Sequence, residues 1–290
     1  MKDRICAILT AYNSSTEIGH SLAAIIPQVT DVVVIDDHSD PEHFAALKKV
    51  MASFPSATII RHPENYGLGN ALNHGLRYAQ EHGYPWAMTL DDNSIAEPDM
   101  VAKMMAAYSA LPIGRQDKIA VLAPNYTTLK GPVYHAPEPL PITTTITAGE
   151  LVKTAIWQQL GGFNETLIIG GIDHDFSFRV IKAGYQTLLI PSAMLHETPG
   201  LIPMVHSLFG KSFIVPSYGP WRYYYTYRNN IFLYKKYWRV VPGWIAKNIF
   251  SDALNFAKIM IFEENRWQKM RMVSRGVRDG SRGRSGKIAA

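Results

Sequence analysis

The chain has 290 residues, of which 47% are hydrophobic and 18% charged, a composition typical of a globular protein with a sizeable core. The single cysteine, Cys6, excludes a disulfide framework, and no run of about 18 uncharged apolar residues predicts a transmembrane helix. The net charge of +5 is unevenly distributed, because residues 221–290 hold 15 Lys and Arg against 4 Asp and Glu, and residues 1–220 hold 14 against 20. An acidic body and a basic C-terminal region are therefore expected to have different roles.

The first part of the sequence alternates apolar runs with segments of helical periodicity. Buried strands are expected at 4–9, 31–35, 58–60 and 86–90, and helices at about 16–26, 41–53 and 65–82. Strands that alternate with helices at this short spacing predict an α/β protein with a parallel, doubly wound sheet. Further along the chain, strands are expected at 118–124 and 187–190 and helices at about 152–160 and before Gly184.

The apolar run at 86–90 ends in Asp91, Asp92 and Asn93. In an open α/β sheet, ligands bind just beyond the carboxyl ends of the strands. Carboxylates at that place can hold a divalent cation, which in turn holds phosphates. An Asx turn that caps the following helix explains the same residues, and the local sequence leaves both interpretations open.

Two other motifs follow predicted strands. Asp36, at the end of the second strand, is placed either to accept hydrogen bonds from a base or ribose or to form a turn. The Gly67-x-Gly69 pair resembles part of a dinucleotide fingerprint, but Leu72 stands where a third Gly or Ala is required. The pair also follows the third strand rather than the first, and we therefore reject an NAD site.

Six motifs occur in a fixed order: Thr10-Ala-Tyr-Asn13, Val34-Ile-Asp-Asp-His-Ser39, Asn65-x-Gly-x-Gly-Asn-Ala-x-Asn73, Leu90-Asp-Asp-Asn93, Gly161-Gly-Phe-Asn-Glu165 and Asp173-x-Asp-x-x-x-Arg179. Together they resemble the family-2 inverting glycosyltransferases of the nucleotide-diphospho-sugar (GT-A) type, over about residues 4–200. The segment from Trp221 to Tyr237 is similar to a subgroup of bacterial rhamnosyltransferases and related galactofuranosyltransferases.

The resemblance implies a GT-A catalytic domain at residues 1–215, with a Rossmann-like, mostly parallel sheet, and a basic, aromatic-rich helical region at residues 216–290. It also implies which residues bind the nucleotide sugar: Ala11, Tyr12, Asn13, Asp36, Gly67, Asn70, Asp91 and Asp92.

Inverting glycosyl transfer requires a carboxylate base that takes the proton of the acceptor hydroxyl. In the family pattern the base lies six residues before the helix arginine, here Arg179, which implies Asp173. Asp175 either orients the acceptor or serves as the base instead. Without the resemblance, two carboxylates at a helix start would be interpreted as partners of the helix dipole.

The resemblance also implies a metal site formed by Asp92, Asn93 and His196, with Mg²⁺ or Mn²⁺ as the cofactor. Asn93 stands where the family's Asp-x-Asp motif has its second carboxylate, and we expect it to weaken cation binding because an amide carries no charge. His196, after the predicted strand at 187–190, resembles the histidine that completes the family's metal site. The imidazole favours Mn²⁺ slightly.

We therefore expect a cytoplasmic transferase, because the N-terminus lacks the features of a signal peptide. Its expected donor is dTDP-L-rhamnose, or alternatively UDP-galactofuranose. Its expected acceptor is a growing cell-surface glycan on a lipid carrier. The basic C-terminal region either packs as a helical subdomain or lies at the inner face of the membrane, where each Lys or Arg adds about 1 kcal/mol. A homo-oligomer is possible. The alternatives are a non-catalytic protein that binds sugar nucleotides and a nucleic-acid-binding protein, and the dense aromatic cluster on a predicted helix disfavours the latter.

Overall fold

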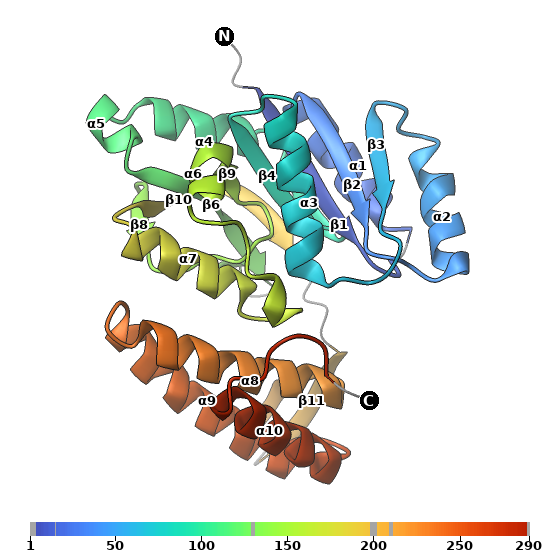
Figure 1. Ribbon diagram of the computed structural model, residues 1–290, viewed down its shortest axis with the longest axis vertical. Helices are drawn as coiled ribbons and strands as arrows, with labels where there is room; N and C mark the ends of the chain where they lie inside the picture. Colours follow the sequence, from blue (N-terminus) through green and yellow to red (C-terminus); the bar gives the residue numbers. More distant parts are fainter. Residues whose placement is uncertain (1–3, 15, 129–130, 198–201, 209–210, 289–290) are drawn as a thin grey trace. The chain divides into compact units, whose positions relative to one another are not determined.

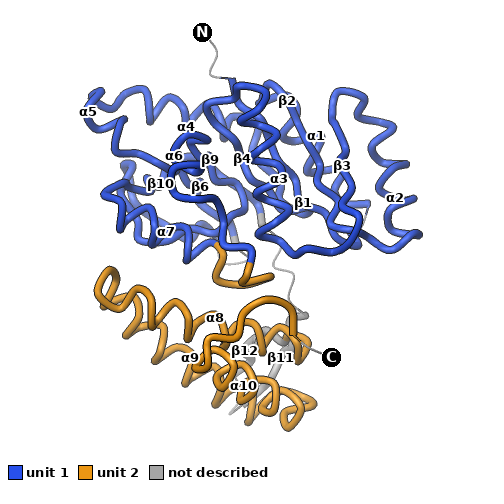
Figure 2. The backbone as a smooth tube through the Cα atoms, viewed as in Figure 1, with its two compact units in different colours: residues 1–165, 173–198 blue, residues 166–172, 199–290 orange. Residues whose placement is uncertain are grey.

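The structure is a computed structural model of the chain and describes residues 4–14, 16–128, 131–197, 202–208 and 211–288. The chain divides into two compact units, coloured in Figure 2. Unit 1 comprises Met1–Glu165 and Asp173–Thr198, and unit 2 comprises Thr166–Ile172 and Pro199–Ala290. The expected border between a catalytic domain and a C-terminal region after residue 215 stays a prediction.

Unit 1 is built on a mixed sheet, to which the described residues contribute ten strands (Figure 1). Its order is β3-β2-β1-β4-β9-β6-β10-β5, with β7 beside β6 and β8 beside β10. The strands are β1 (Ile5–Ala11), β2 (Asp31–Asp36), β3 (Ala57–Arg61), β4 (Trp86–Asp91), β5 (Ser94–Ala96), β6 (Ile119–Thr128), β7 (Gly131–Pro132), β8 (Leu140–Ile142), β9 (Leu151–Lys153) and β10 (Gln186–Glu197).

The first four strands of the sequence form the parallel half of the sheet, as predicted. β1 pairs with β2 and β4, and β2 pairs with β3, all in parallel. Nearly every residue of β1 is buried, which is typical of a parallel strand covered on both faces. The sequence therefore predicts this half of the sheet correctly from its continuous apolar runs.

The second half of the sheet differs from the sequence expectation in two places. The helix expected at 152–160 starts only at Thr154, because β9 inserts antiparallel between β4 and β6. The strand expected to end at residue 190 continues to Glu197, since a register shift between Ile190 and Met194 lets β10 pair with β6 on both sides of the shift.

Helices cover both faces of the sheet. Leu22 of α1 and Met104 of α4 pack in one buried cluster with Leu9 of β1. Ile8 points to the opposite face, where an added Cβ on Gly75 of α3 would overlap its side chain. The helices of this part of the chain are α1 (Ile18–Ile25), η1 (Ile26–Gln28), α2 (Pro41–Met51), α3 (Leu68–Glu81), α4 (Met100–Ser109), α5 (Ile113–Gln116), α6 (Thr154–Gln159), η2 (Glu165–Leu167) and α7 (Ile172–Lys182).

The described residues of unit 2 form an antiparallel hairpin and three long helices, which confirms the expected helical C-terminal extension. Proline begins α8 and α9, where its missing N–H costs nothing. An added Cβ on Gly280 of α10 would lie 2.7 Å from the carbonyl oxygen of Arg228 in α8, so glycine permits this close approach. The elements are β11 (Ile202–Leu208), β12 (Lys211–Ser217), α8 (Pro220–Tyr237), α9 (Pro242–Phe262) and α10 (Arg266–Ser281). Within the described part of the chain, none of the helices combines the length and apolarity needed to cross a bilayer.

Candidate active site

The carboxyl ends of β1, β2 and β4 meet at one edge of the sheet. Ala11 lies opposite Asp36 in the β1–β2 pair, and Thr10 lies opposite Asp91 in the β1–β4 pair. The strand order reverses between β1 and β4, and ligands of open α/β sheets bind at such a point. Three of the residues predicted to bind a nucleotide sugar, Ala11, Asp36 and Asp91, are therefore neighbours at this edge.

The turn after β1 presents an aromatic ring. Asn13 has a φ of 50°, a conformation that Asn adopts more readily than most residues. Its N–H donates to Ser39 Oγ at 2.8 Å, and its side chain exchanges hydrogen bonds of 3.0 and 2.8 Å with Asp40. Tyr12, just before it, is 54% exposed. A fixed turn thus holds an accessible ring beside the sheet edge, where a nucleobase can stack.

Asp36 is fully buried and its carboxylate is engaged inside the protein. It accepts hydrogen bonds from the hydroxyl and N–H of Ser39, and its Oδ2 lies 3.3 Å from Arg61 Nε. Arg61 also donates to the Ser39 carbonyl at 2.7 Å. In this conformation Asp36 holds the turn after β2, and its contact with a nucleotide stays a prediction.

Asp37 has a role that the sequence analysis did not assign. Its two oxygens accept hydrogen bonds of 2.8 Å from the N–H groups of Tyr66 and Gly67, and Oδ1 lies 2.9 Å from His62 Nδ1. His62 Nε2 in turn lies 2.9 Å from His74 Nδ1. Burial, aided by His62, lowers the pKa of His74. Asp37 therefore fixes the turn in which Gly67 has a φ of 92° before α3 begins.

Asn70 joins two of the sequence motifs. Its Nδ2 donates to Glu165 Oε2 at 2.8 Å, and Asn73 Nδ2 donates to Glu165 Oε1 at 2.7 Å. Asn73 Oδ1 accepts from the Phe163 N–H at 2.7 Å, and an added Cβ on Gly162 would lie 2.8 Å from the same oxygen. The amide of Asn70 thus holds the 161–165 loop against α3, and its predicted contact with the donor stays a prediction.

Asp91 is the last residue of β4, Asp92 and Asn93 form the turn to β5, and all three residues are half-buried. The Asp91 N–H donates to Ser94 Oγ at 3.2 Å, and the Asp92 carbonyl accepts from the Ser21 hydroxyl of α1 at 2.9 Å. Burial raises the pKa of Asp92. A cation beside this carboxyl would favour its ionised form and offset that effect.

His196 lies inside β10, not in the loop expected after a shorter strand. In the antiparallel pairing of β10 with β5 it is opposite Ile95, two residues after Asn93. His196 Nε2 lies 3.3 Å from Glu97 Oε1. Across the residues that the structure describes, no three His, Cys, Asp or Glu side chains gather closely enough to hold a metal ion.

The donor atoms predicted for the metal site nevertheless suit a hard divalent cation. Asp92 offers carboxylate oxygens, Asn93 a carbonyl oxygen and His196 an imidazole nitrogen, and the β5–β10 register brings their backbones near one another. Mg²⁺ commonly takes only one or two carboxylates from a protein and completes its shell with water and substrate phosphates. The types of donor atom therefore suit a cation that is bound jointly with a diphosphate, and the metal site of Asp92, Asn93 and His196 stays a prediction.

Asp173 lies in the first turn of α7, and its side chain is 19% exposed. His174 donates its N–H to Asp173 Oδ1 at 2.8 Å, and His174 Nδ1 lies 3.2 Å from the same oxygen. Burial opposes ionisation of Asp173, but the charge and hydrogen bonds of His174 outweigh it and lower the pKa of Asp173. Burial also opposes the charging of His174, and the carboxylate outweighs it and raises the pKa of His174. Asp173 is therefore a partly accessible, ionised carboxylate.

Asp175 differs from Asp173 in both exposure and partner. It is 1% exposed, and its Oδ2 accepts a hydrogen bond of 2.8 Å from Nε of Arg179, one helical turn further on. Arg179 also donates to the Leu160 carbonyl at 2.7 Å. This buried ion pair ties α7 to the end of α6.

Glu150 is a site residue that the sequence analysis missed. It is 2% exposed, and its Oε1 has no hydrogen-bond partner within the described residues. Its carbonyl accepts from the Thr89 N–H at 3.0 Å, two residues before Asp91. Burial, and then the negative charge of Asp173, raise the pKa of Glu150 well above its usual value. The backbone of Glu150 therefore binds β4, and its carboxyl is sensitive to the charge of Asp173. A Glu at the start of an apolar strand was its only signal in the sequence.

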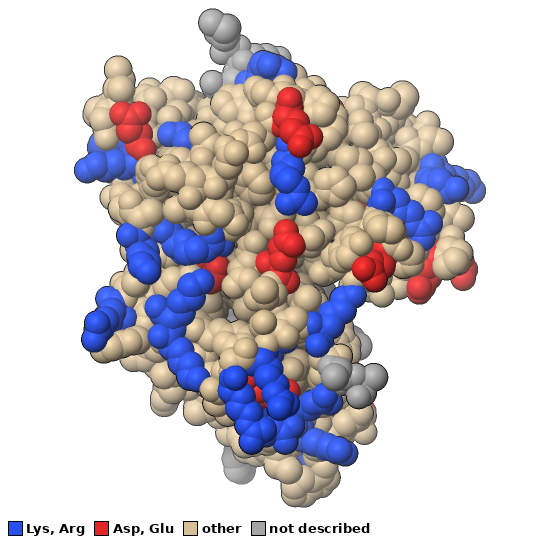
Figure 3. All heavy atoms as spheres, viewed as in Figure 1, with Lys and Arg blue, Asp and Glu red and all other residues tan. Residues whose placement is uncertain are grey.

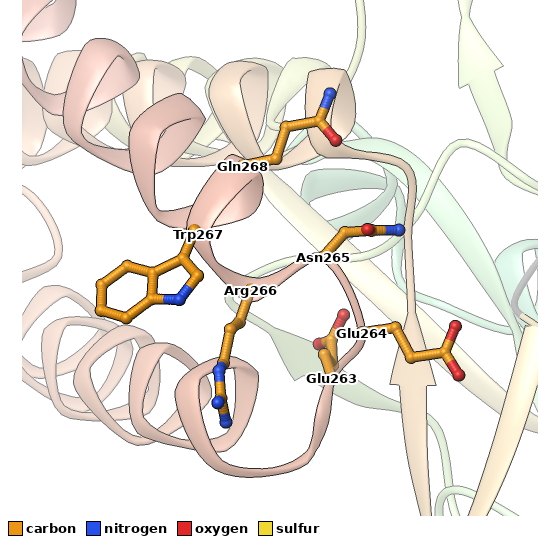
Figure 4. A pocket seen from close by; sticks show the side chains of 6 residues that line it. All are labelled: Glu263, Glu264, Asn265, Arg266, Trp267 and Gln268. Carbon is orange, nitrogen blue, oxygen red and sulfur yellow. The ribbon is translucent and has the colours of Figure 1, made fainter.

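A surface depression of about 690 Å³ lies elsewhere, at the turn between α9 and α10 in unit 2 (Figure 4). It is lined by residues 263–268, whose labelled side chains point in different directions. Glu263 is already engaged, because Tyr223 donates to it and Lys269 pairs with it, both at 2.6 Å. None of the predicted site residues lines this depression.

The mixed, mostly parallel sheet with helices on both faces is of the GT-A type that the motifs predict. Residues 6–121 match the sequence profile of glycosyl transferase family 2. This part of the chain thus has the sequence profile of a glycosyl transferase family 2 domain, which agrees with the resemblance drawn from the motifs and with the predicted fold.

Full-length comparisons agree with this assignment. The chain is 25% identical over 308 aligned positions to dTDP-rhamnosyl transferase RfbF from Shigella flexneri, covering 99% of this chain and 98% of that protein. Its structure is similar to mannosyltransferase PcManGT from Pyrobaculum calidifontis in complex with GDP-Man and Mn²⁺, with a TM-score of 0.57, 15% identity, and coverage of 98% and 76% of the two chains. It also resembles GalNAc-T7 with UDP, GalNAc and Mn²⁺, with a TM-score of 0.55 and 15% identity over 71% of this chain, but spans only 44% of that one.

Proposed function

We propose that this protein is an inverting, metal-dependent glycosyltransferase that moves one sugar from a nucleotide-diphosphate donor to a hydroxyl of a growing glycan. Asp173 carries this proposal. It is a partly exposed carboxylate with a lowered pKa in the first turn of α7, and its charge acts on Glu150, which pairs with the end of β4. An ionised base at that edge is what the reaction requires.

The reaction is a single displacement. The acceptor oxygen attacks the anomeric carbon while its proton passes to Asp173, and the bond from that carbon to the diphosphate oxygen breaks, which inverts the anomeric centre. We assign the base to Asp173 rather than Asp175, because Asp175 is buried and paired with Arg179. Asp175 then holds the helix that presents the base.

A divalent cation, Mg²⁺ or Mn²⁺, would be held by Asp92, Asn93 and His196 and would neutralise the charge that develops on the departing diphosphate. The solved structures of the mannosyltransferase and of GalNAc-T7 both contain Mn²⁺. In our proposal Tyr12 stacks on the base of the donor, and Ala11 and Asp91 lie beside its ribose and diphosphate at the sheet edge.

The proposed donor is dTDP-L-rhamnose. The likeness to a dTDP-rhamnosyl transferase over nearly the whole of both chains supports this donor, whereas the solved structures carry GDP-Man in one case and UDP with GalNAc in the other. UDP-galactofuranose is the alternative, because the segment from Trp221 to Tyr237 also resembles galactofuranosyltransferases.

The proposed acceptor is a lipid-linked glycan, and one face of α9 supports a place for the protein at the inner face of the cell membrane. Ile249, Phe250, Leu254 and Ile261 are 47–66% exposed and share one face of this helix. The exposed Lys247 lies at the border of that face. Apolar side chains bordered by lysine are typical of a helix that lies in a membrane interface.

The charge of unit 2 favours an anionic lipid surface over a second copy of the chain. Lys and Arg gather over the surface formed by α10 (Figure 3). Residues 221–290 carry 15 Lys and Arg against 4 Asp and Glu, so two copies would repel one another through this region, whereas an anionic leaflet attracts it.

The first experiment is a thermal-shift series with dTDP-rhamnose and UDP-galactofuranose, each with and without Mn²⁺ or Mg²⁺. A ligand that binds only the folded state raises its stability by RT ln(1 + [L]/Kd), so the true donor should raise Tm in a cation-dependent manner. That donor is then incubated with lipid-linked acceptors, and NMR determines the anomeric configuration of the product. A retained configuration contradicts the inverting mechanism, and no shift with any donor contradicts the donor site.

A non-catalytic protein that binds sugar nucleotides is the second candidate, and Asn93 is the observation that favours it. An amide at this position brings no charge to the metal site. Cation-dependent donor binding without transfer to any lipid-linked acceptor would support this candidate over the enzyme.

A further inference from the structure

The proposed base follows directly on a segment that belongs to the C-terminal unit. Thr166–Ile172 is part of unit 2, although Glu165 before it and Asp173 after it are part of unit 1 (Figure 2). One peptide bond joins Ile172 to Asp173, and α7 begins at Ile172. The conformation of this segment therefore bears directly on where the helix that carries Asp173 starts.

The segment has an unusual backbone. Ile168 has a φ of 65°, a region that β-branched residues rarely occupy because of steric strain. The Ile169 N–H donates to the Leu167 carbonyl at 2.7 Å and closes a γ-turn with Ile168 at its centre. A γ-turn whose central residue has a positive φ is the rarer, strained type. Gly170 and Gly171 follow with φ values of 77° and 76°. Such a conformation persists only where surrounding contacts impose it.

Two adjacent side chains of α8 supply these contacts. Asn229 Nδ2 lies 2.9, 3.0 and 2.8 Å from the carbonyl oxygens of Leu167, Ile169 and Gly170. Arg228 Nη2 lies 3.1 Å from the Leu167 carbonyl oxygen and 3.3 Å from that of the preceding residue, Thr166. Both side chains have no exposed surface, so the carbonyls of the strained turn have donors from this pair in place of water.

The pair is itself held in position. Arg228 Nε donates to Asn229 Oδ1 at 2.9 Å, which orients the amide with its nitrogen toward the segment. Arg228 also donates to the Gly286 carbonyl, and the Gly286 N–H donates to the Thr166 carbonyl at 2.9 Å. An added Cβ on Gly171 would lie 3.2 Å from Leu233 and 3.7 Å from Asn229, so the segment passes close to α8.

We infer that Arg228 and Asn229 are positioning residues for the catalytic base, an inference that rests on the proposed function. By binding the carbonyls of residues 166, 167, 169 and 170, the pair holds the strained turn in one conformation and thereby sets the start of α7 and the place of Asp173. The pair acts on Asp173 through the chain itself, because Ile172 and Asp173 are joined by one peptide bond. Neither residue touches the reacting atoms.

Asn229→Ala tests this inference, and Asn230→Ala is its matched control. Asn230 is the next residue of α8, and its amide binds Asp252 at 2.9 and 3.1 Å rather than the segment. With the full-length protein, Asn229→Ala should lower kcat at least 100-fold and change the Kd for the donor less than threefold, while Asn230→Ala keeps kcat within threefold. Asn229→Gln keeps the amide but moves it by one methylene and should recover only part of kcat. An unchanged kcat in Asn229→Ala, or equal losses in both alanine variants, would overturn the inference.

Hydrogen exchange followed by mass spectrometry separates this inference from the proposed function, because it needs neither donor nor acceptor. Amides of residues 167–174 should exchange at least tenfold faster in Asn229→Ala than in the wild type, and at the wild-type rate in Asn230→Ala. Faster exchange combined with an inactive wild type would show that the pair holds the segment and that the proposed function is wrong. Unchanged exchange at residues 167–174 would overturn the inference whatever the activity.

Discussion

Asp173→Asn and Asp175→Asn should have different effects, although the two residues are only two positions apart and both substitutions remove a carboxylate from the first turn of α7. Asp173 is the proposed base, with a side chain that is 19% exposed. Asp175 forms a buried ion pair with Arg179 at 2.8 Å, in which the side chains are 2% and 17% exposed. We expect the first substitution to remove activity with little effect on stability, and the second to reduce stability.

The magnitudes follow from these environments. Asp173→Asn removes a general base, which contributes roughly 10²–10⁴-fold to a rate. It also loses a partly exposed pair with His174, worth at most about 1 kcal/mol. Asp175→Asn leaves Arg179 buried without its counter-charge, which costs about 3 kcal/mol, at the low end of the usual range because Asn keeps one acceptor oxygen. For a unit of this size such a loss lowers Tm by roughly 6–12 °C.

The assay measures Tm by calorimetry and kcat with the donor identified by thermal shift, both well below the Tm of the weaker variant. Asp173→Asn should keep Tm within about 4 °C of the wild type, retain donor binding and lose kcat. Asp175→Asn should lose Tm, and its folded fraction should keep kcat within about tenfold. Near-normal transfer by Asp173→Asn would refute the assignment of the base, and a loss of kcat in Asp175→Asn at unchanged Tm would move that role to Asp175.

Three further outcomes are expected. The raised pKa of Glu150 means that the wild type loses stability as pH rises from the unfolded-state pKa toward the folded-state pKa, whereas Glu150→Gln does not titrate. The free energy of unfolding of the variant relative to the wild type should therefore grow with pH, by up to about 1.4 kcal/mol per pH unit, and Tm should follow it; a constant difference between pH 5 and pH 8 would contradict the buried carboxyl. Replacing Phe250 and Leu254, which are 66% and 47% exposed, with Ser should weaken co-sedimentation with vesicles that contain phosphatidylglycerol by about tenfold or more at unchanged Tm. Equal sedimentation would exclude the α9 face as the membrane contact. Asn93→Asp should tighten Mn²⁺ binding by about tenfold, measured by titration calorimetry, because it adds a charged oxygen ligand. An unchanged affinity would remove residue 93 from the metal site.

The sequence predicted best those features that depend on local pattern. Continuous apolar runs identify β1, β2 and β4, and polar residues at their ends identify the site edge. β9 escaped prediction because its three residues run directly into α6, so the apolar pattern looks like one helix. β10 was predicted too short because Pro191 suggests an end, whereas a register shift carries the strand past it to His196.

Features that depend on distant partners were not predictable in this way. Asp36 and Asp37 are adjacent and chemically identical, yet one pairs with Arg61 and the other binds backbone N–H groups before α3. Only the fold decides which of the two carboxylates pairs with the arginine and which binds the backbone N–H groups. The burial of Glu150 and the contacts of Asn229 with a segment about sixty residues earlier in the chain also arise from tertiary packing.

The carboxylates of the sheet edge form a charge pattern that explains why a cation belongs in the proposed reaction. Arg61 and Arg179 compensate Asp36 and Asp175, and burial favours the neutral form of Glu150. Asp173 differs because the net effect of its surroundings is a lowered pKa, so it keeps its negative charge at neutral pH. In the proposed reaction a nucleoside diphosphate would bring further negative charge to the same edge, beside Asp91 and Asp92, and like charges would oppose its binding. A divalent cation would then attract the diphosphate to this edge and leave Asp173 ionised for the acceptor proton. Because Asn93 is an uncharged amide, the protein would contribute less negative charge to such a cation, and more of the positive charge of the cation would remain for the diphosphate.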